Sequence, residues 1–135
     1  EVRVFAGCVT RRQREWPLLP AERVQGFRLA CALAHGELEV ADVIEDATRP
    51  RFRCRVVHEV AHAPFRGFNR AQAAVVEGAI LVSRLHMLPP EKIDTELAYL
   101  EIAIGKTAGP AEAEAWGWIR DAVTDSRRRQ AAGGS

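Results

Sequence analysis

The sequence has few cysteines and almost no net charge, and each shortage excludes a class of protein. Its three cysteines, Cys8, Cys31 and Cys54, form no C-x-x-C pair and cannot all pair within one chain. We therefore expect buried free thiols and a reducing, cytoplasmic compartment. A formal net charge of +1 gives nucleic acid and anionic membranes no bulk electrostatic attraction, so neither is an expected partner.

Long apolar runs are also missing. No stretch is long and uninterrupted enough to span a bilayer, and none resembles a cleavable signal peptide. The rest is an ordinary globular balance, with 47% hydrophobic and 27% charged residues over 135 positions, which suits one small domain or one domain with a helical appendage. The chain starts at Glu1 already inside a helical apolar pattern of Val2, Phe5 and Val9, so we expect a helix over residues 2–12 and a segment upstream of it.

A strict alternation of side chains predicts a β-hairpin. Residues 37–44 and 51–58 alternate between apolar and polar side chains, and the polar turn between them contains a proline. Such a pair of runs is typical of two antiparallel strands. We expect Leu38 and Val40 to face inward on the first strand, and Phe52, Cys54 and Val56 to share one face of the second.

After Pro64 the apolar period changes from two to about 3.6. Residues 70–88 are apolar nearly all round, which is typical of a helix covered by neighbours. A second helix is expected around an apolar stripe from Ile93 to Ile104, and a third around Trp116, Ile119 and Val123. A strand-rich part followed by three helices predicts an α+β fold.

The HEVAH segment, residues 58–62, matches H-E-x-x-H, a pattern that places two zinc ligands and a general base on one helix. In that interpretation His58 and His62 bind zinc and Glu59 activates water. The preceding RFRCRVV favours strand, however, and residues four apart on a strand lie about 13 Å from each other, too far for one ion. Pro64 also stops any helix soon after the motif. We therefore predict no metal site, and a zinc hydrolase is the alternative.

Residues 65–70, Phe-Arg-Gly-Phe-Asn-Arg, stand at the start of the helix expected over 70–88. The first N–H groups of a helix lack partners and its dipole favours negative charge there. Gly67 lets a ligand approach closely, and either arginine can bind a phosphate in a bidentate way. The two phenylalanines can pack on a ligand ring or anchor the turn in the core. The alternative is a helix capped by Asn69, with arginines that pair with Glu77 or meet solvent.

A longer set of motifs resembles a known family, the domain of unknown function 447. Its members are flavin-reductase-like proteins of archaea and of bacteria with methanopterin-linked one-carbon metabolism. The likeness runs from about Trp16 to Ile119 and is most specific over Phe65 to Pro110. The matching motifs are Arg66-Gly67-Phe68-Asn69-Arg70-Ala71, AILVSRLHMLP at residues 79–89, and Lys106-Thr107-Ala108-Gly109-Pro110.

The resemblance implies an antiparallel split β-barrel that binds FMN at a homodimer interface, followed by a small helical domain. On this basis residues 1–64 would be the C-terminal part of the barrel, 65–130 the helical subdomain and 131–135 a disordered tail. The family's first barrel strands, which carry many flavin contacts, have no counterpart in this sequence. The flavin-contact candidates are Arg66, Gly67, Phe68, Asn69 and Arg70.

Three functional hypotheses follow. The first is an FMN-binding split-barrel homodimer, which the resemblance extends to a flavin-dependent oxidoreductase of methanopterin-type one-carbon metabolism. Because no acid, base or nucleophile stands out as catalytic, this hypothesis includes binding without turnover. The second is the zinc hydrolase. The third is a non-catalytic helical assembly module, since an apolar helix over 70–88 needs partners to cover it.

Overall fold

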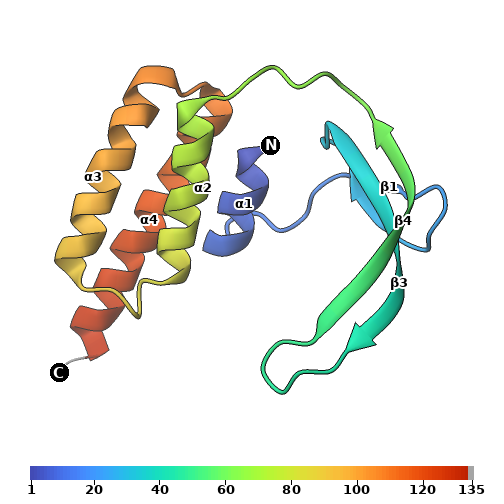
Figure 1. The fold of residues 1–135 in the computed structure, drawn as a ribbon. Coiled ribbons are helices and arrows are strands. Elements are labelled where there is room, and N and C mark those ends of the chain that lie inside the picture. Colours follow the sequence, from blue (N-terminus) through green and yellow to red (C-terminus); the bar gives the residue numbers. More distant parts are fainter. Residues whose placement is uncertain (134–135) are drawn as a thin grey trace. The chain divides into compact units, whose positions relative to one another are not determined.

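The computed structural model describes residues 1–133, which form two compact units with an α+β composition (Figure 1). The helical unit contains Glu1–Glu15 and the chain from Gly67 onward, and the strand unit is Trp16–Arg66. This division differs from the predicted one, which grouped residues 1–64. Residues 1–15 join the helices because α1, Val2–Thr10, packs on two helices from the other end of the chain.

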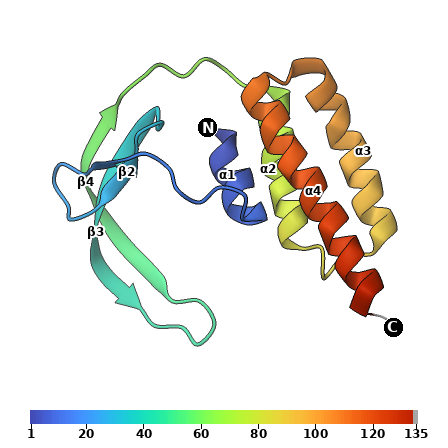
Figure 2. The ribbon, with the colours of Figure 1, turned by 180° about the vertical axis from the view of Figure 1, so that it is seen from behind.

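The helical unit contains four helices in the described residues. The sequence predicted the three that follow Pro64 as one subdomain and assigned the helix near the N-terminus to the other. The four helices are α1, α2 (Arg70–Ser83), α3 (Pro90–Thr107) and α4 (Pro110–Gly133). Helix α2 contacts each of the other three (Figures 1 and 2). Helix α4 also takes in residues 131–133, which were expected in a disordered tail, while 134–135 lie outside the described residues. None of the described helices combines the length and apolarity needed to cross a membrane.

The covering of α2 bears on the assembly-module hypothesis. The buried residues of α2 face its neighbours within the same unit: Ala71, Ala74, Val75, Gly78, Ala79 and Leu81. Other parts of the chain therefore supply the cover that an all-round apolar helix needs. The reason for proposing a module that requires a second protein is thereby removed.

The core of the helical unit joins residues from both ends of the chain. Its main cluster consists of Val2, Ala6, Val75, Ala115, Trp116 and Ile119, and a second cluster of Leu81, Ile93 and Val123. The predicted inward positions on α3 and α4 are thus confirmed. On α1 the buried face is Val2 and Ala6, whereas Phe5 is 55% exposed and Val9 is also exposed. The predicted Val2-Phe5-Val9 face is therefore wrong, because Ala6 allows the closer approach of α1 to the other helices.

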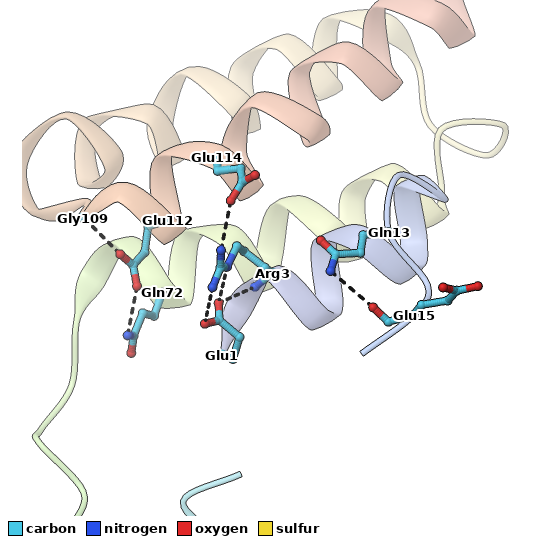
Figure 3. Close-up of polar contacts among 8 residues, drawn as sticks. All are labelled: Glu1, Arg3, Gln13, Glu15, Gln72, Gly109, Glu112 and Glu114. Carbon is cyan, nitrogen blue, oxygen red and sulfur yellow. Dashed lines mark hydrogen bonds and ion pairs between the residues drawn. The ribbon is translucent and has the colours of Figure 1, made fainter. Parts of the chain in front are cut away.

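Exposed ion pairs also connect α1 to α4. The guanidinium of Arg3 donates to Glu114 at 3.2 Å and to Glu1 at 3.0 Å (Figure 3). Arg12 donates to Asp121 at 3.0 Å. Because exposed pairs are screened by solvent, they add little to stability, and apolar packing holds α1 in place.

Helix α2 ends at Ser83, five residues before the predicted end. Beyond it the backbone forms short-range turns, with Arg84 N–H donating to the Leu81 carbonyl and Met87 N–H to the Arg84 carbonyl. A proline disfavours helical geometry in the residue before it, so Pro89 and Pro90 exclude a helix beyond Leu88 but do not by themselves set the end at Ser83. Pro90 then serves as the first residue of α3, where its missing N–H costs no hydrogen bond.

Two helical glycines are expected to respond in opposite ways to alanine. A Cβ at Gly78 would lie 2.8 Å from Cζ3 of Trp116 and 3.1 Å from Cδ1 of Ile119, both buried, whereas a Cβ at Gly105 on α3 would meet no atom within 4 Å. Overpacking should make Gly78→Ala destabilising by about 1–3 kcal/mol. Gly105→Ala should stabilise α3 by up to about 1 kcal/mol. Urea unfolding measures both, and a stabilising Gly78→Ala would contradict the packing described.

The strand unit consists of two separate two-stranded antiparallel sheets in the described residues. Strand β1 (Leu18–Pro20) pairs with β2 (Phe27–Leu29), and β3 (Ala34–Ile44) pairs with β4 (Arg51–Ala61). The predicted hairpin is confirmed and is three residues longer at each free end. These strands do not close into a barrel. Of the expected split barrel, the structure shows only the antiparallel pairing of its strands.

The apolar side chains of the hairpin are exposed, which corrects two predictions. Leu38 lies opposite Val56, and Val40 opposite Cys54, so the alternation does align them across the strands. All four are exposed rather than inward-facing. The three cysteines are free, as expected, but none is buried. A two-stranded sheet cannot bury its own face, and the described residues of this unit supply no cover for it.

Candidate functional site

Residues 65–70 carry the proposed flavin contacts and join the two units. Arg66 is the last residue of the strand unit, and the chain returns to the helical unit at Gly67. Gly67 has a φ of 96°, a backbone region that glycine adopts without strain. Phe65 is exposed, and Phe68 is 100% exposed. The interpretation in which these phenylalanines anchor the turn in the core is therefore wrong.

Asn69 caps α2 as predicted, and it does so together with Thr107. Its Oδ1 accepts a hydrogen bond from the Ala71 N–H at 2.8 Å, and Thr107 Oγ1 accepts from the same N–H at 3.1 Å. The Asn69 amide also donates to the Thr107 carbonyl at 3.1 Å. Two of the family motifs, far apart in sequence, thus meet at the N-terminus of α2. The Asn69 side chain is already used to hold them together.

A second polar link fixes the N-termini of α2 and α4 to each other (Figure 3). Glu112 accepts from the Gly109 N–H at 3.0 Å, in the manner of a capping box, and from the Gln72 amide at 3.1 Å. Glu112 is itself buried. Because these contacts satisfy it fully within the protein, we assign Glu112 a structural role.

The two arginines of the segment are the groups left for an anion. Arg66 and Arg70 are exposed, and neither forms an ion pair among the residues that the structure describes. The alternative predicted from the sequence is therefore seen in one of its two forms: Asn69 caps the helix and the arginines meet solvent rather than pair with Glu77. Arg70 stands in the first turn of α2, where the helix dipole attracts negative charge. Either arginine alone offers a guanidinium of the kind that binds a phosphate.

The HEVAH segment is strand, as its alternation predicted. Strand β4 continues through Ala61, and His62 follows directly. Within residues 1–133 no group of three His, Cys, Asp or Glu side chains is placed to hold a metal ion. The H-E-x-x-H match therefore lacks the helix on which its zinc chemistry depends.

The histidines of this segment instead contact a third histidine on the neighbouring strand. His35 lies opposite Val60, and so between His58 and His62. Nδ1 of His35 is 2.9 Å from Nε2 of His62, and the two rings are nearly parallel, at 11°. The ring of His58 meets that of His35 edge-on, with centroids 6.0 Å apart. Its Nε2 is at ion-pair distance, 3.2 Å, from Glu22, without the geometry of a hydrogen bond.

Glu37 contacts this cluster through His35 and is only 3% exposed. Its carboxylate accepts hydrogen bonds from the backbone N–H groups of Glu22, Arg23 and Val24 at 2.6, 2.6 and 2.9 Å. The other ring nitrogen of His35, Nε2, lies 3.1 Å from the same carboxylate. Glu37 therefore fixes both the loop between β1 and β2 and the ring of His35.

These surroundings shift the pKa values of two groups. Burial alone would raise the pKa of Glu37, but the hydrogen bonds from Glu22, Arg23, His35 and Val24 outweigh it and hold that pKa at about 2. The pKa of His62 is lowered by desolvation and by the positive charges of Arg28 and His35, against the opposing effect of Glu22. At neutral pH Glu37 is therefore a carboxylate.

The His35–His62 contact was not predicted from the sequence. The available signal was that His35 and Glu37 stand two apart on one strand, and His58 and His62 four apart on the next. Residues spaced by an even number share a face of a strand. Which histidine meets which, however, depends on the hairpin register, and that requires the strand ends, which the sequence placed three residues short.

Comparison with known proteins relates the helical unit to a family. Residues 69–121 match the C-terminal domain model of the protein of unknown function DUF447. The chain is also similar to the crystal structure of FMN-bound protein MM1853 from Methanosarcina mazei, of the same DUF447 family, with a TM-score of 0.63 and 19% sequence identity. The similarity covers 80% of this chain and 58% of that one, so this chain spans little more than half of that protein's length.

No curated protein matches the chain. The segment matched by the family model includes the cap at Asn69, all of α2 and α3, and the Lys106-to-Pro110 motif. The resemblance to the DUF447 family, predicted from these motifs, is therefore confirmed, mainly for the C-terminal portion of this chain.

Proposed function

We propose that this chain is part of an FMN-binding protein. The observation that carries the proposal is its similarity in fold, over 80% of its length, to a DUF447 protein that is FMN-bound. The family match over residues 69–121 agrees with this similarity, because it is to the same DUF447 family. FMN, when bound, supplies electron transfer through its ring, while the protein provides binding and orientation.

The proposed contacts are Arg66, Gly67, Phe68, Asn69 and Arg70. In this assignment the two exposed arginines hold the phosphate, aided by the positive end of the α2 dipole. Gly67 provides the turn that brings the backbone close to it. Asn69 acts indirectly, because its side chain is already hydrogen-bonded to Ala71 and Thr107 and keeps the end of the helix in place.

The proposal has two further parts, a homodimer and an oxidoreductase role. A homodimer is supported by the exposed apolar side chains of the β3–β4 hairpin. Sedimentation equilibrium at micromolar concentration tests it, since a stable monomer would contradict it.

An oxidoreductase role, in methanopterin-type one-carbon metabolism, rests on the family resemblance. Anaerobic reduction and re-oxidation of the bound flavin tests that role, and a flavin that no donor reduces would leave binding without turnover.

Comparing FMN with riboflavin, which lacks the phosphate, tests the site directly. Arg66→Ala and Arg70→Ala should each weaken FMN binding by about 10- to 100-fold, because a hydrogen bond to a charged group contributes about 1.5–3 kcal/mol. Riboflavin binding should change little in either variant. Quenching of flavin fluorescence on titration with protein measures both ligands.

The matched control is Arg84→Ala. Arg84 is also exposed but follows the last residue of α2, at the negative end of the dipole, so this variant should bind FMN like the wild type. If wild-type protein binds no FMN, the proposed function is wrong. If it binds FMN but the two arginine variants bind equally well, the function stands and the assigned contacts are wrong.

A further inference from the structure

Three side chains of the strand unit form a continuous hydrogen-bonded chain that flavin binding does not use. Glu37, buried and ionised, can only accept hydrogen bonds, so Nε2 of His35 must carry the proton that faces it at 3.1 Å. In a neutral His35 the opposite nitrogen, Nδ1, is then an acceptor. The proton in the 2.9 Å contact must therefore come from Nε2 of His62. The geometry fixes one tautomer for each ring.

We propose that Glu37, His35 and His62 form a proton relay that acts as an acid–base site at the open end of the β3–β4 hairpin. His62 is the exposed member, and its Nδ1 is the nitrogen outside the chain. A proton taken up at Nδ1 of His62 allows its Nε2 proton to pass to Nδ1 of His35. The result is an imidazolium at His35 beside the Glu37 carboxylate, and a neutral His62 that carries its proton on Nδ1.

The electrostatic surroundings favour this final state. The carboxylate of Glu37 lies against His35 and stabilises positive charge there. Arg28 from β2 opposes charge on His62, while Glu22 from the β1–β2 loop partly offsets it. His58 faces His35 from β4 and is close to Glu22 rather than to Glu37. A second proton would set an N–H of one ring against an N–H of the other, so the pair binds it less readily than the first.

The relay ends at the exposed ring of His62 and is therefore open to solvent. A depression of about 400 Å³ lies at the same end of the hairpin, lined by Ala34, His35, Gly36, Glu59, Val60 and Ala61. Of the three relay members only His35 lines this depression, so proton exchange takes place with water or a solute at the exposed ring of His62. The relay is complete within the strand unit and does not depend on bound flavin.

Ring-nitrogen NMR of protein labelled with ¹⁵N-histidine tests the relay. At high pH both His35 and His62 should carry the proton on Nε2. As the pH falls, one proton should enter the pair, and His62 should switch from the Nε2–H to the Nδ1–H tautomer while charge appears on His35. The second proton should enter in a separate step at lower pH. His86, exposed on the helical unit, supplies a reference signal from outside the relay.

Two variants complete the test. In His35→Gln, His62 should titrate in one step without a change of tautomer; in Glu37→Gln, the first proton should remain on His62. Backbone signals of the strand unit report whether each variant is folded, and the wild type and His35→Gln decide the matter if Glu37→Gln is not. A wild-type His62 that titrates in one step, keeps its tautomer and is unaffected by His35→Gln would overturn the proposal.

Discussion

Replacing Ala6 by aspartate is expected to destabilise the helical unit by about 3–5 kcal/mol, the range for a charge buried without a partner. Ala6 is 0% exposed and belongs to the main core cluster with Val75, Trp116 and Ile119. A carboxylate there would either stay charged among apolar side chains or force α1 away from α2 and α4. Urea unfolding, followed by the helical circular dichroism signal, measures the loss.

The control for this prediction lies two residues further along the same helix. Cys8 is exposed, so Cys8→Asp introduces the same charge without burying it and should change stability by less than about 0.5 kcal/mol. Equal effects of the two substitutions would show that α1 is not part of the helical core. The family model covers only residues 69–121, so the experiment tests a contribution to that domain from outside the matched segment.

Replacing Glu37 by alanine is expected to release the loop between β1 and β2. The backbone N–H groups of Glu22, Arg23 and Val24 would all lose their acceptor at once, and unpaired donors in a folded loop are costly. Their hydrogen exchange should rise to the rate of exposed loop amides. The control is Glu39→Ala on the same strand, because Glu39 forms an exposed ion pair with Arg55, whose loss should leave those three amides protected.

The same carboxylate gives the strand unit a defined sensitivity to acid. The pKa of Glu37 is lower in the folded state, about 2, than its usual value of 4.5, so its contribution to stability is complete above about pH 4.5 and is lost as the pH falls toward 2. The lowered pKa of His62 acts in the same direction, starting just below pH 6.5. Hydrogen exchange of the β1–β2 loop against pH measures this loss, and loop amides that stay equally protected at pH 3 would contradict it.

Much of the local structure could be predicted because it depends on neighbours in sequence. Alternation located the β3–β4 hairpin, Asn69 was identified as a cap, and prolines marked the start of α3 and α4. Strands β1 and β2 escaped prediction because three residues are too few to show a period. The end of α2 was placed five residues too late because Leu85 and Leu88 continue the helical spacing and Pro89 disfavours helix only in the residue before it.

The sequence by itself determined the β3–β4 hairpin, the starts of α2, α3 and α4, the motifs that resemble the DUF447 family, and the failure of HEVAH to form a zinc helix. Only the tertiary structure decided that α1 packs into the helical core, that Asn69 meets Thr107, and that His35 lies between His58 and His62. The physical reason is how far apart in the sequence the interacting residues lie. Caps and periods depend on residues a few positions apart, whereas these contacts join residues far apart in the sequence, such as His35 with His62 and Val2 with Ile119. Over such separations packing and register select the partner.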